Sequence, residues 1–145
     1  FHRAGDGGRF HPSVPMQAYA MLRRTMLPVV LPSRSASANP SAYAGGYSLR
    51  GTVLASEDRR RFTVWVINRD DAGAPVRLEL PPAGGRAVAA VLEHLTAGSF
   101  SAHNYDSPDV VAPRRTPVEL VFDATGTARY RVPPRSVSAL VFTLD

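Results

Sequence analysis

The sequence predicts an all-β protein: an antiparallel, jelly-roll-like β-sandwich of about eight short strands, preceded by one N-terminal α-helix. From residue 28 onward, apolar residues alternate with a period of two, which is typical of strands with one buried face. Turn-forming stretches separate these runs, and the chain holds 13 Pro and 11 Gly in total. Because no helical pattern interrupts the series, strand–helix–strand units with a parallel sheet are not expected.

The helix is predicted over residues 13–26. Ser13 is suited to cap the free N–H groups, Pro15 fits a first turn, and Pro28 ends the pattern. The residues that recur at helical spacing form one apolar face; they are Val14, Ala18, Met21, Leu22, Thr25 and Met26. The preceding residues 1–12 are rich in Gly and read as irregular.

Strands follow at short intervals. They are expected at 29–37, where the pattern is weak, and at 47–56, 60–69, 75–80, 87–95, 117–123, 128–132 and 136–144. The second and third of these, joined by a polar turn, predict a hairpin. Turns are expected at 69–73, 81–85, 123–126 and 133–136, where Gly, Pro and Asp gather.

One strand carries apolar residues on both faces. Phe62, Val64 and Val66 share one side of 60–69, while Trp65 and Ile67 lie on the other. A sandwich strand normally needs only one apolar face. The second face is therefore expected to be covered, either by the leading helix or the 31–46 loop, or by a partner domain.

Length and composition exclude several classes of function. A length of 145 residues suffices for one domain with a core, and the absence of Cys excludes disulfides and thiolate chemistry. No apolar run reaches the roughly 20 residues of a membrane helix, so no membrane partner is expected. The chain starts at Phe1 without a signal-peptide pattern, and we expect it to be a piece of a longer protein.

All 17 basic residues are Arg, and the net charge is +5. Two interpretations are open: an anion-binding surface, since Arg grips carboxylate and phosphate with two hydrogen bonds, or a GC-rich coding bias. The Arg residues are scattered apart from Arg59, Arg60 and Arg61, which favours coding bias. No alternating aromatics accompany that cluster, so no nucleic-acid partner is expected.

The sequence shows no arrangement of residues typical of a metal site, a serine nucleophile or a carboxylate pair. The four His lie at positions 2, 11, 94 and 103 without metal-ligand spacing, so neither a metal nor another cofactor is expected. His103 with Asp106 or Asp109 lacks a serine in a nucleophile-elbow sequence. No pair of Glu or Asp is placed to flank a glycosidic bond, as paired-carboxylate glycosidases require. The sequence therefore predicts no catalytic residue.

Three segments together resemble the C-terminal part of glycoside hydrolase family 51 α-L-arabinofuranosidases. They are FTVWVINRD at 62–70, AHNYDSPDVVAPR at 102–114, which is the most specific, and YRVPPRSVSALVF at 130–142. The resemblance covers roughly residues 26–145. It implies that residues 1–27 end a catalytic (β/α)₈ barrel and that 28–145 form the sandwich behind it.

The resemblance also implies a division of roles. The parent enzyme would remove terminal α-L-arabinofuranosyl residues from a glycan with retention, using two barrel Glu that this chain lacks. The sandwich would pack on that barrel, with Trp65 and Ile67 facing it, and the parent could assemble as a homo-oligomer. Phe10 and His11 stand where family members place a substrate-contacting polar residue, often Gln.

The polar stretch at 101–115 lies between two apolar runs and does not itself have the pattern of a strand. Residues that commonly bond nearby backbone or stiffen a turn are concentrated in it: His103, Asn104, Asp106, Pro108 and Asp109. We expect an ordered connection at the seam with the barrel rather than a catalytic loop. The alternative for the whole chain is a carbohydrate-binding module, which would require a row of exposed aromatics on one sheet face.

Overall fold

The computed structural model describes residues 2–3, 10–37, 47–99, 101–104 and 110–145, with only the backbone of 2–3 and 10–11. Its elements in chain order are β1 (His2–Arg3), β2 (Phe10–His11), α1 (Val14–Thr25), β3 (Val29–Leu31), β4 (Leu49–Ala55), β5 (Arg61–Asn68), β6 (Ala74–Glu79), the short 3-10 helix η1 (Pro81–Ala83), β7 (Ala87–Thr96), β8 (Arg114–Val121), β9 (Thr127–Val132) and β10 (Ser136–Thr143).

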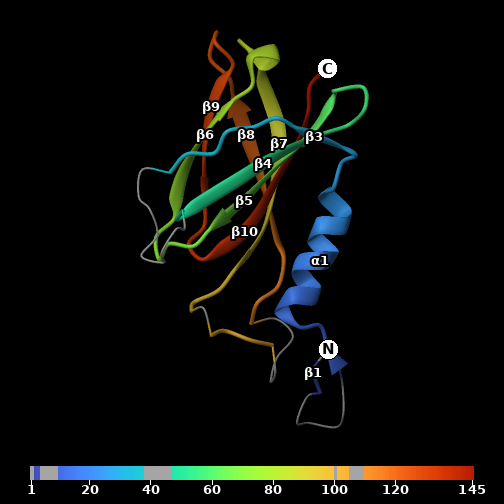
Figure 1. Cartoon of the computed structure of the whole chain (residues 1–145), viewed down its shortest axis with the longest axis vertical. Helices are drawn as coiled ribbons and strands as arrows, with labels where there is room; N and C mark the ends of the chain where they lie inside the picture. Colours follow the sequence, from blue (N-terminus) through green and yellow to red (C-terminus); the bar gives the residue numbers. More distant parts are fainter. Residues whose placement is uncertain (1, 4–9, 38–46, 100, 105–109) are drawn as a thin grey trace.

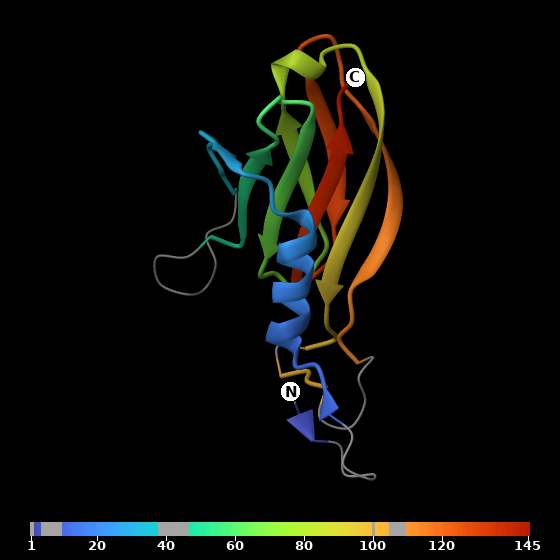
Figure 2. The same ribbon diagram turned by 90° about the vertical axis from the view of Figure 1, so that its right-hand side faces the viewer.

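The described strands form antiparallel sheets in a sandwich-like arrangement. The larger sheet has the order β3-β4-β5-β10-β7-β8, the smaller pairs β6 with β9, and β1 pairs with β2. Figures 1 and 2 show α1 on one side of the six-stranded sheet and the β6–β9 pair on the other. The predicted antiparallel sandwich with one N-terminal helix is confirmed.

The main core lies between the two sheets. Alternate residues of β5 and β10 point into it, and the rings of Phe62 and Phe142 stack with centroids 5.4 Å apart. Val76, Leu78 and Leu80 pack into this core from the β6 side, as the alternation of 75–80 predicts. Strand periodicity therefore identified the inward faces of β5 and β6.

A second, smaller cluster joins α1 to the opposite face of the six-stranded sheet. Met21 is fully buried there with Leu95 and Val111, and Trp65 and Val137 pack against them. The helix starts as predicted, since the Ser13 hydroxyl accepts a hydrogen bond from the Met16 N–H at 3.4 Å. The helix therefore functions as a third layer.

Several boundaries differ from the predicted ones. β8 begins at Arg114 instead of 117, which places Pro117 inside a strand. This agrees with the position of β8 at the edge of its sheet, since Pro within sheets is found on edge strands. β3 ends at Leu31, and the β1–β2 pair was not predicted, because a two-residue strand has no periodicity to detect.

The turn at 123–126 forms as predicted and shows why it needs Gly. Gly126 has a φ of 80°, and a Cβ there would lie 2.4 Å from the Leu80 carbonyl oxygen. Asp123 Oδ1 accepts hydrogen bonds from the backbone N–H groups of Thr125 and Thr127, both at 2.9 Å. The turn brings β9 back beside β6.

Candidate functional site

The outer face of the six-stranded sheet, beside α1, is the most apolar exposed region among the described residues. Two hollows flank the helix there, one of about 240 Å³ and the other of about 400 Å³. Ile67 lines both of them. We call this region the helix-side surface; its exposed apolar residues are Met16, Tyr19, Met26 and Ile67.

The structure distinguishes between Trp65 and Ile67, which the sequence placed on the same face. Trp65 is half-buried against the α1 cluster, so the helix covers it in part. Ile67, two residues along β5, is 47% exposed. Of the alternatives for covering the second apolar face, the leading helix accounts for Trp65 but not for Ile67.

An ion-pair group fixes the helix to this face. Glu93 on β7 is buried, and its side chain is bound by Arg24 of α1, with Arg115 Nε of β8 at 3.9 Å from the other carboxylate oxygen. Two guanidinium groups beside one buried carboxylate offset its loss of hydration. The sequence signal for this contact is a lone Glu within an apolar strand, and its partners lie too far along the chain to be assigned from sequence.

Asn104 anchors the polar loop that carries the most specific family motif. It is fully buried, and its amide nitrogen donates to the carbonyl oxygens of Pro12 at 3.2 Å and Val111 at 2.9 Å. Its Oδ1 accepts from the Val111 N–H at 2.9 Å. Asn104 thus joins the loop to the residue just before the helix cap, which is a structural role.

For the other predicted site residues, the structure gives no substrate-binding geometry. His103 is exposed, whereas Asp106, Pro108 and Asp109 lie outside the described residues. Phe10 and His11 form β2, and the structure describes their backbone alone. Substrate contact by Phe10 or His11 therefore stays a prediction.

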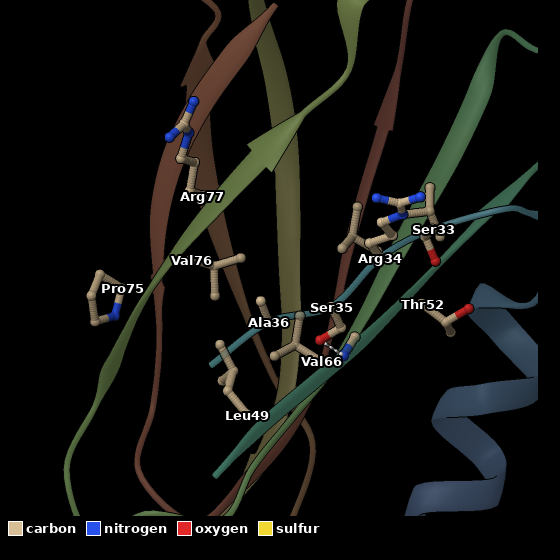
Figure 3. A pocket seen from close by; sticks show the side chains of 13 residues that line it. Ser33, Arg34, Ser35, Ala36, Leu49, Thr52, Val66, Pro75, Val76 and Arg77 are labelled. Carbon is tan, nitrogen blue, oxygen red and sulfur yellow. Dashed lines mark hydrogen bonds between the residues drawn. The ribbon is translucent and has the colours of Figure 1, made fainter. Parts of the chain in front are cut away.

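A cavity of about 250 Å³ opens on the opposite side, between β4 and β6. Figure 3 shows Val76 of β6 and Leu49 and Val66 of β4 and β5 reaching toward it, with Arg77 on one side and Arg34 on the other. The Ser35 hydroxyl accepts from the Gly51 N–H at 3.1 Å, which ties segment 33–36 to β4. Local sequence does not indicate this cavity, because residues far apart in the chain form it.

Buried titratable groups occur inside the sandwich as well. Burial lowers the pKa of His94 and raises that of Tyr130. His94 Nδ1 and the Tyr130 hydroxyl have no hydrogen-bond partner among the described residues. Neither side chain opens onto the helix-side surface, since Tyr130 belongs to the main core and His94 shares a face of β7 with the core residue Leu92.

Three or more His, Cys, Asp or Glu do not gather anywhere in the described ranges in a way that could hold a metal ion. Within the same ranges, no helix combines the length and apolarity needed to cross a membrane.

Several glycoside hydrolases are among the solved structures that this chain resembles in fold. An arabinose-bound family 51 α-L-arabinofuranosidase superposes with a TM-score of 0.65 at 18% identity, covering 92% of this chain and 20% of its own. The arabinose complex of the α-L-arabinofuranosidase from Thermotoga maritima gives 0.59 at 21% identity, covering 70% and 20%.

The chain shares the fold of one part of these enzymes. The catalytic domain of a family 30 xylanase from Talaromyces cellulolyticus also matches, with a TM-score of 0.53 at 18% identity, covering 89% of this chain and 24% of its own. This chain spans about a fifth of the length of the arabinofuranosidases. No protein-family model and no curated protein sequence matches it.

Proposed function

We propose that this chain is the non-catalytic C-terminal portion of an α-L-arabinofuranosidase-like glycoside hydrolase, in which the sandwich packs on a catalytic (β/α)₈ barrel and stabilises it. Residues 1–27 would be the end of that barrel and 28–145 the sandwich. The parent enzyme would remove terminal α-L-arabinofuranosyl residues with retention, and its barrel would supply both catalytic Glu.

The observation that carries this proposal is the extent of the fold match. The superposition on the arabinose-bound enzyme covers 92% of this chain but only a fifth of that enzyme. A separate binding module would have no reason to share so large a part of its fold with one region of a longer glycosidase. The three family-like segments agree with the same assignment.

The helix-side surface supports a packed partner. Tyr19 is 67% exposed, Met26 62% and Ile67 47%, and two hollows lined mostly by apolar atoms lie beside Ile67. Exposed apolar surface of this kind is typical of interaction sites. We assign its occupant as the barrel, because α1 would be that barrel's last helix.

The described carboxylates support a non-catalytic role. Glu93 is bound by Arg24 and Arg115, and Glu79 lies 2.9 Å from Arg77. Glu57 is in the β4–β5 turn and Glu119 is exposed on β8. We therefore place the acid and the nucleophile of the reaction in the barrel.

The carbohydrate-binding module is the weaker candidate. Trp65 is half-buried beside α1 and Tyr130 is in the core, which leaves Tyr19 and Tyr47 as exposed aromatics among the described residues. Tyr19 lies on the helix and Tyr47 precedes β4, so they do not form a row on one sheet. Arabinan binding that Trp65→Ala abolishes in a folded chain would favour the module.

The activity of the purified chain and the mass of the native protein test the proposal. The purified chain is expected to release no nitrophenol from 4-nitrophenyl α-L-arabinofuranoside, while the native protein is expected to contain a barrel, in the same polypeptide or associated with it. In that native enzyme, Ile67→Asp should lower the thermal midpoint of activity. Val121→Asp is the matched control, because Val121 is also exposed but lies on the edge strand β8.

Two results would contradict the proposal. Turnover by the pure chain would show that it holds its own active site. A native protein of 15.6 kDa with no associated barrel would leave the helix-side surface without the proposed partner.

A further inference from the structure

The outer face of the β6–β9 sheet gathers positive charge that is dispersed in the sequence. Arg77 of β6 lies directly opposite Arg129 of β9, and Arg131 lies two residues further along β9, opposite Pro75. All three Arg are exposed. We call Arg77, Arg129 and Arg131 the basic face.

Acidic residues do little to neutralise this face. Glu79 is the only acidic residue within β6 and β9, and its side chain and that of Arg77 are 63% and 60% exposed, so solvent screens their 2.9 Å contact. Asp123, near Arg129, already accepts hydrogen bonds from Thr125 and Thr127. The basic face therefore keeps a net positive charge.

The pairing of Arg77 with Arg129 is unfavourable in the isolated molecule. Directly opposed residues in an antiparallel pair have their Cβ atoms roughly 4.5–5.5 Å apart, and like-charged side chains on such residues destabilise a sheet. Arg131 directs one N–H at the Gly73 carbonyl oxygen, at 3.0 Å, which leaves its remaining donors available. An anion bound between these guanidinium groups would remove the repulsion.

The cavity between β4 and β6 adjoins this face, because Arg77 belongs to both. Arg34 lines its other side and has no hydrogen bond or ion pair to the described residues. Apolar side chains line the cavity together with Ser33 and Ser35 (Figure 3). A lining of apolar side chains with hydroxyls and cations suits a sugar ring that carries a carboxylate.

We propose that the basic face, together with this cavity, binds a carboxylate-bearing polysaccharide, that is, a polymer containing uronic acid. The glycan class rests on the proposed function, whereas the carboxylate is inferred from the Arg residues, which bind that group with two parallel hydrogen bonds. The sheet carrying this face lies on the side away from α1 (Figures 1 and 2), so a barrel on the helix-side surface leaves it free.

Other polyanions fit less well. A duplex DNA binder typically makes about 6–10 phosphate contacts, more than the Arg of this face can provide. The outward residues of β6 and β9 include no aromatic side chain on which bases could stack. Pro75 is the only apolar side chain among them, so there is nothing to insert into a lipid surface.

The test measures binding of polygalacturonate to the full chain, with neutral arabinan and duplex DNA as comparison ligands. The double variant Arg77→Thr/Arg129→Thr is expected to weaken polygalacturonate binding by about tenfold or more, because two charge-assisted contacts are lost. Arg60→Thr/Arg61→Thr removes the same charge at the β4–β5 turn and should change binding by less than about twofold.

Two further measurements guard against misfolding. Without ligand, Arg77→Thr/Arg129→Thr should keep or raise the thermal midpoint of unfolding, since the opposed charges are gone. Arg77→Lys/Arg129→Lys keeps the charge but not the two-bond geometry, and should weaken binding to an intermediate extent. The Lys double variant therefore still tests the site if the Thr double variant does not fold.

Absence of polygalacturonate binding to the unaltered chain would overturn the inference, as would equal losses in the Arg60/Arg61 control. Tighter binding of DNA, or equal binding of neutral arabinan, would overturn the uronate assignment. None of these results bears on whether the chain accompanies a barrel. Turnover by the pure chain would refute the proposed function and leave the basic face in place.

Discussion

Individual buried polar residues hold the loops of this protein in place. Asn104 joins the loop before β8 to the residue preceding the helix cap, and Asn68 donates to the carbonyl oxygens of Ala72 and Pro133, at 2.9 and 2.8 Å. Both are at most 2% exposed. Because a buried amide satisfies backbone groups that no strand pairs, such residues determine where the connections run.

Asn104→Ala is expected to lower the free energy of unfolding by about 2–4 kcal/mol, because it removes three hydrogen bonds and leaves buried backbone groups unpaired. Urea unfolding followed by tryptophan fluorescence would measure this. His103→Ala, at an exposed neighbouring position, should cost less than about 1 kcal/mol. Equal effects of the two changes would mean that the loop is not anchored through Asn104.

At the scale of elements, α1 contacts the six-stranded sheet through few residues. Met21 is fully buried in the contact, whereas Met26, which sequence periodicity assigned to the same apolar face, is 62% exposed. Met26 is the C-cap residue with an extended backbone, so it has left the helical path. The apolar face of the helix is therefore shorter than its sequence pattern.

Met21→Ala should therefore destabilise the protein by about 2–5 kcal/mol, the usual effect of truncating a buried Met. Met26→Ala is the matched control and should cost less than about 1 kcal/mol, since its side chain is largely in solvent. Thermal unfolding of both variants would measure the difference. A large effect of Met26→Ala in the isolated chain would contradict the described end of the helix.

At the scale of the whole molecule, global stability depends on pH through His94. This side chain is 9% exposed, and burial is the largest cause lowering its pKa below the ordinary value of 6.5, with Arg114 acting in the same direction. A Leu92 backbone hydrogen bond opposes the shift. The unfolded chain therefore binds a proton at His94 at a pH where the folded chain does not.

It follows that His94 makes the folded state less stable as pH falls below about 6.5. Above that value, neither state is protonated there and the effect vanishes. The free energy of unfolding, measured from pH 7.5 down to about pH 5, should drop more steeply in the unaltered chain than in His94→Gln. Parallel curves for the two proteins would mean that His94 has the same pKa in the folded and the unfolded chain.

Much of the fold could be predicted from local sequence. Period-two alternation located the inward residues of β5 and β6, and Ser13, Pro15 and Pro28 marked the ends of the helix. Strand boundaries were less accurate at β3 and β8. There, pairing with a neighbour and position at the sheet edge decide how far a strand extends, and neither is a local property.

The candidate surfaces were predicted only in part. Apolar residues on both faces of β5 indicated that something must cover the second face, but not that α1 reaches Trp65 and leaves Ile67 open. The interpretation of the Arg residues as scattered was incomplete. Arg77 and Arg129 are 52 positions apart, and antiparallel pairing of β6 with β9 places them side by side.

The sequence by itself determined the all-β class, the leading helix, the polar turns and the inward faces of the strands, because each depends on residues a few positions apart. The tertiary structure alone decided the order of strands in the sheets, the Arg24–Glu93–Arg115 ion-pair group, the cavity beside β6 and the basic face. These features arise from contacts between distant segments. Their formation depends on how the sheets and the helix pack together, which local periodicity does not encode.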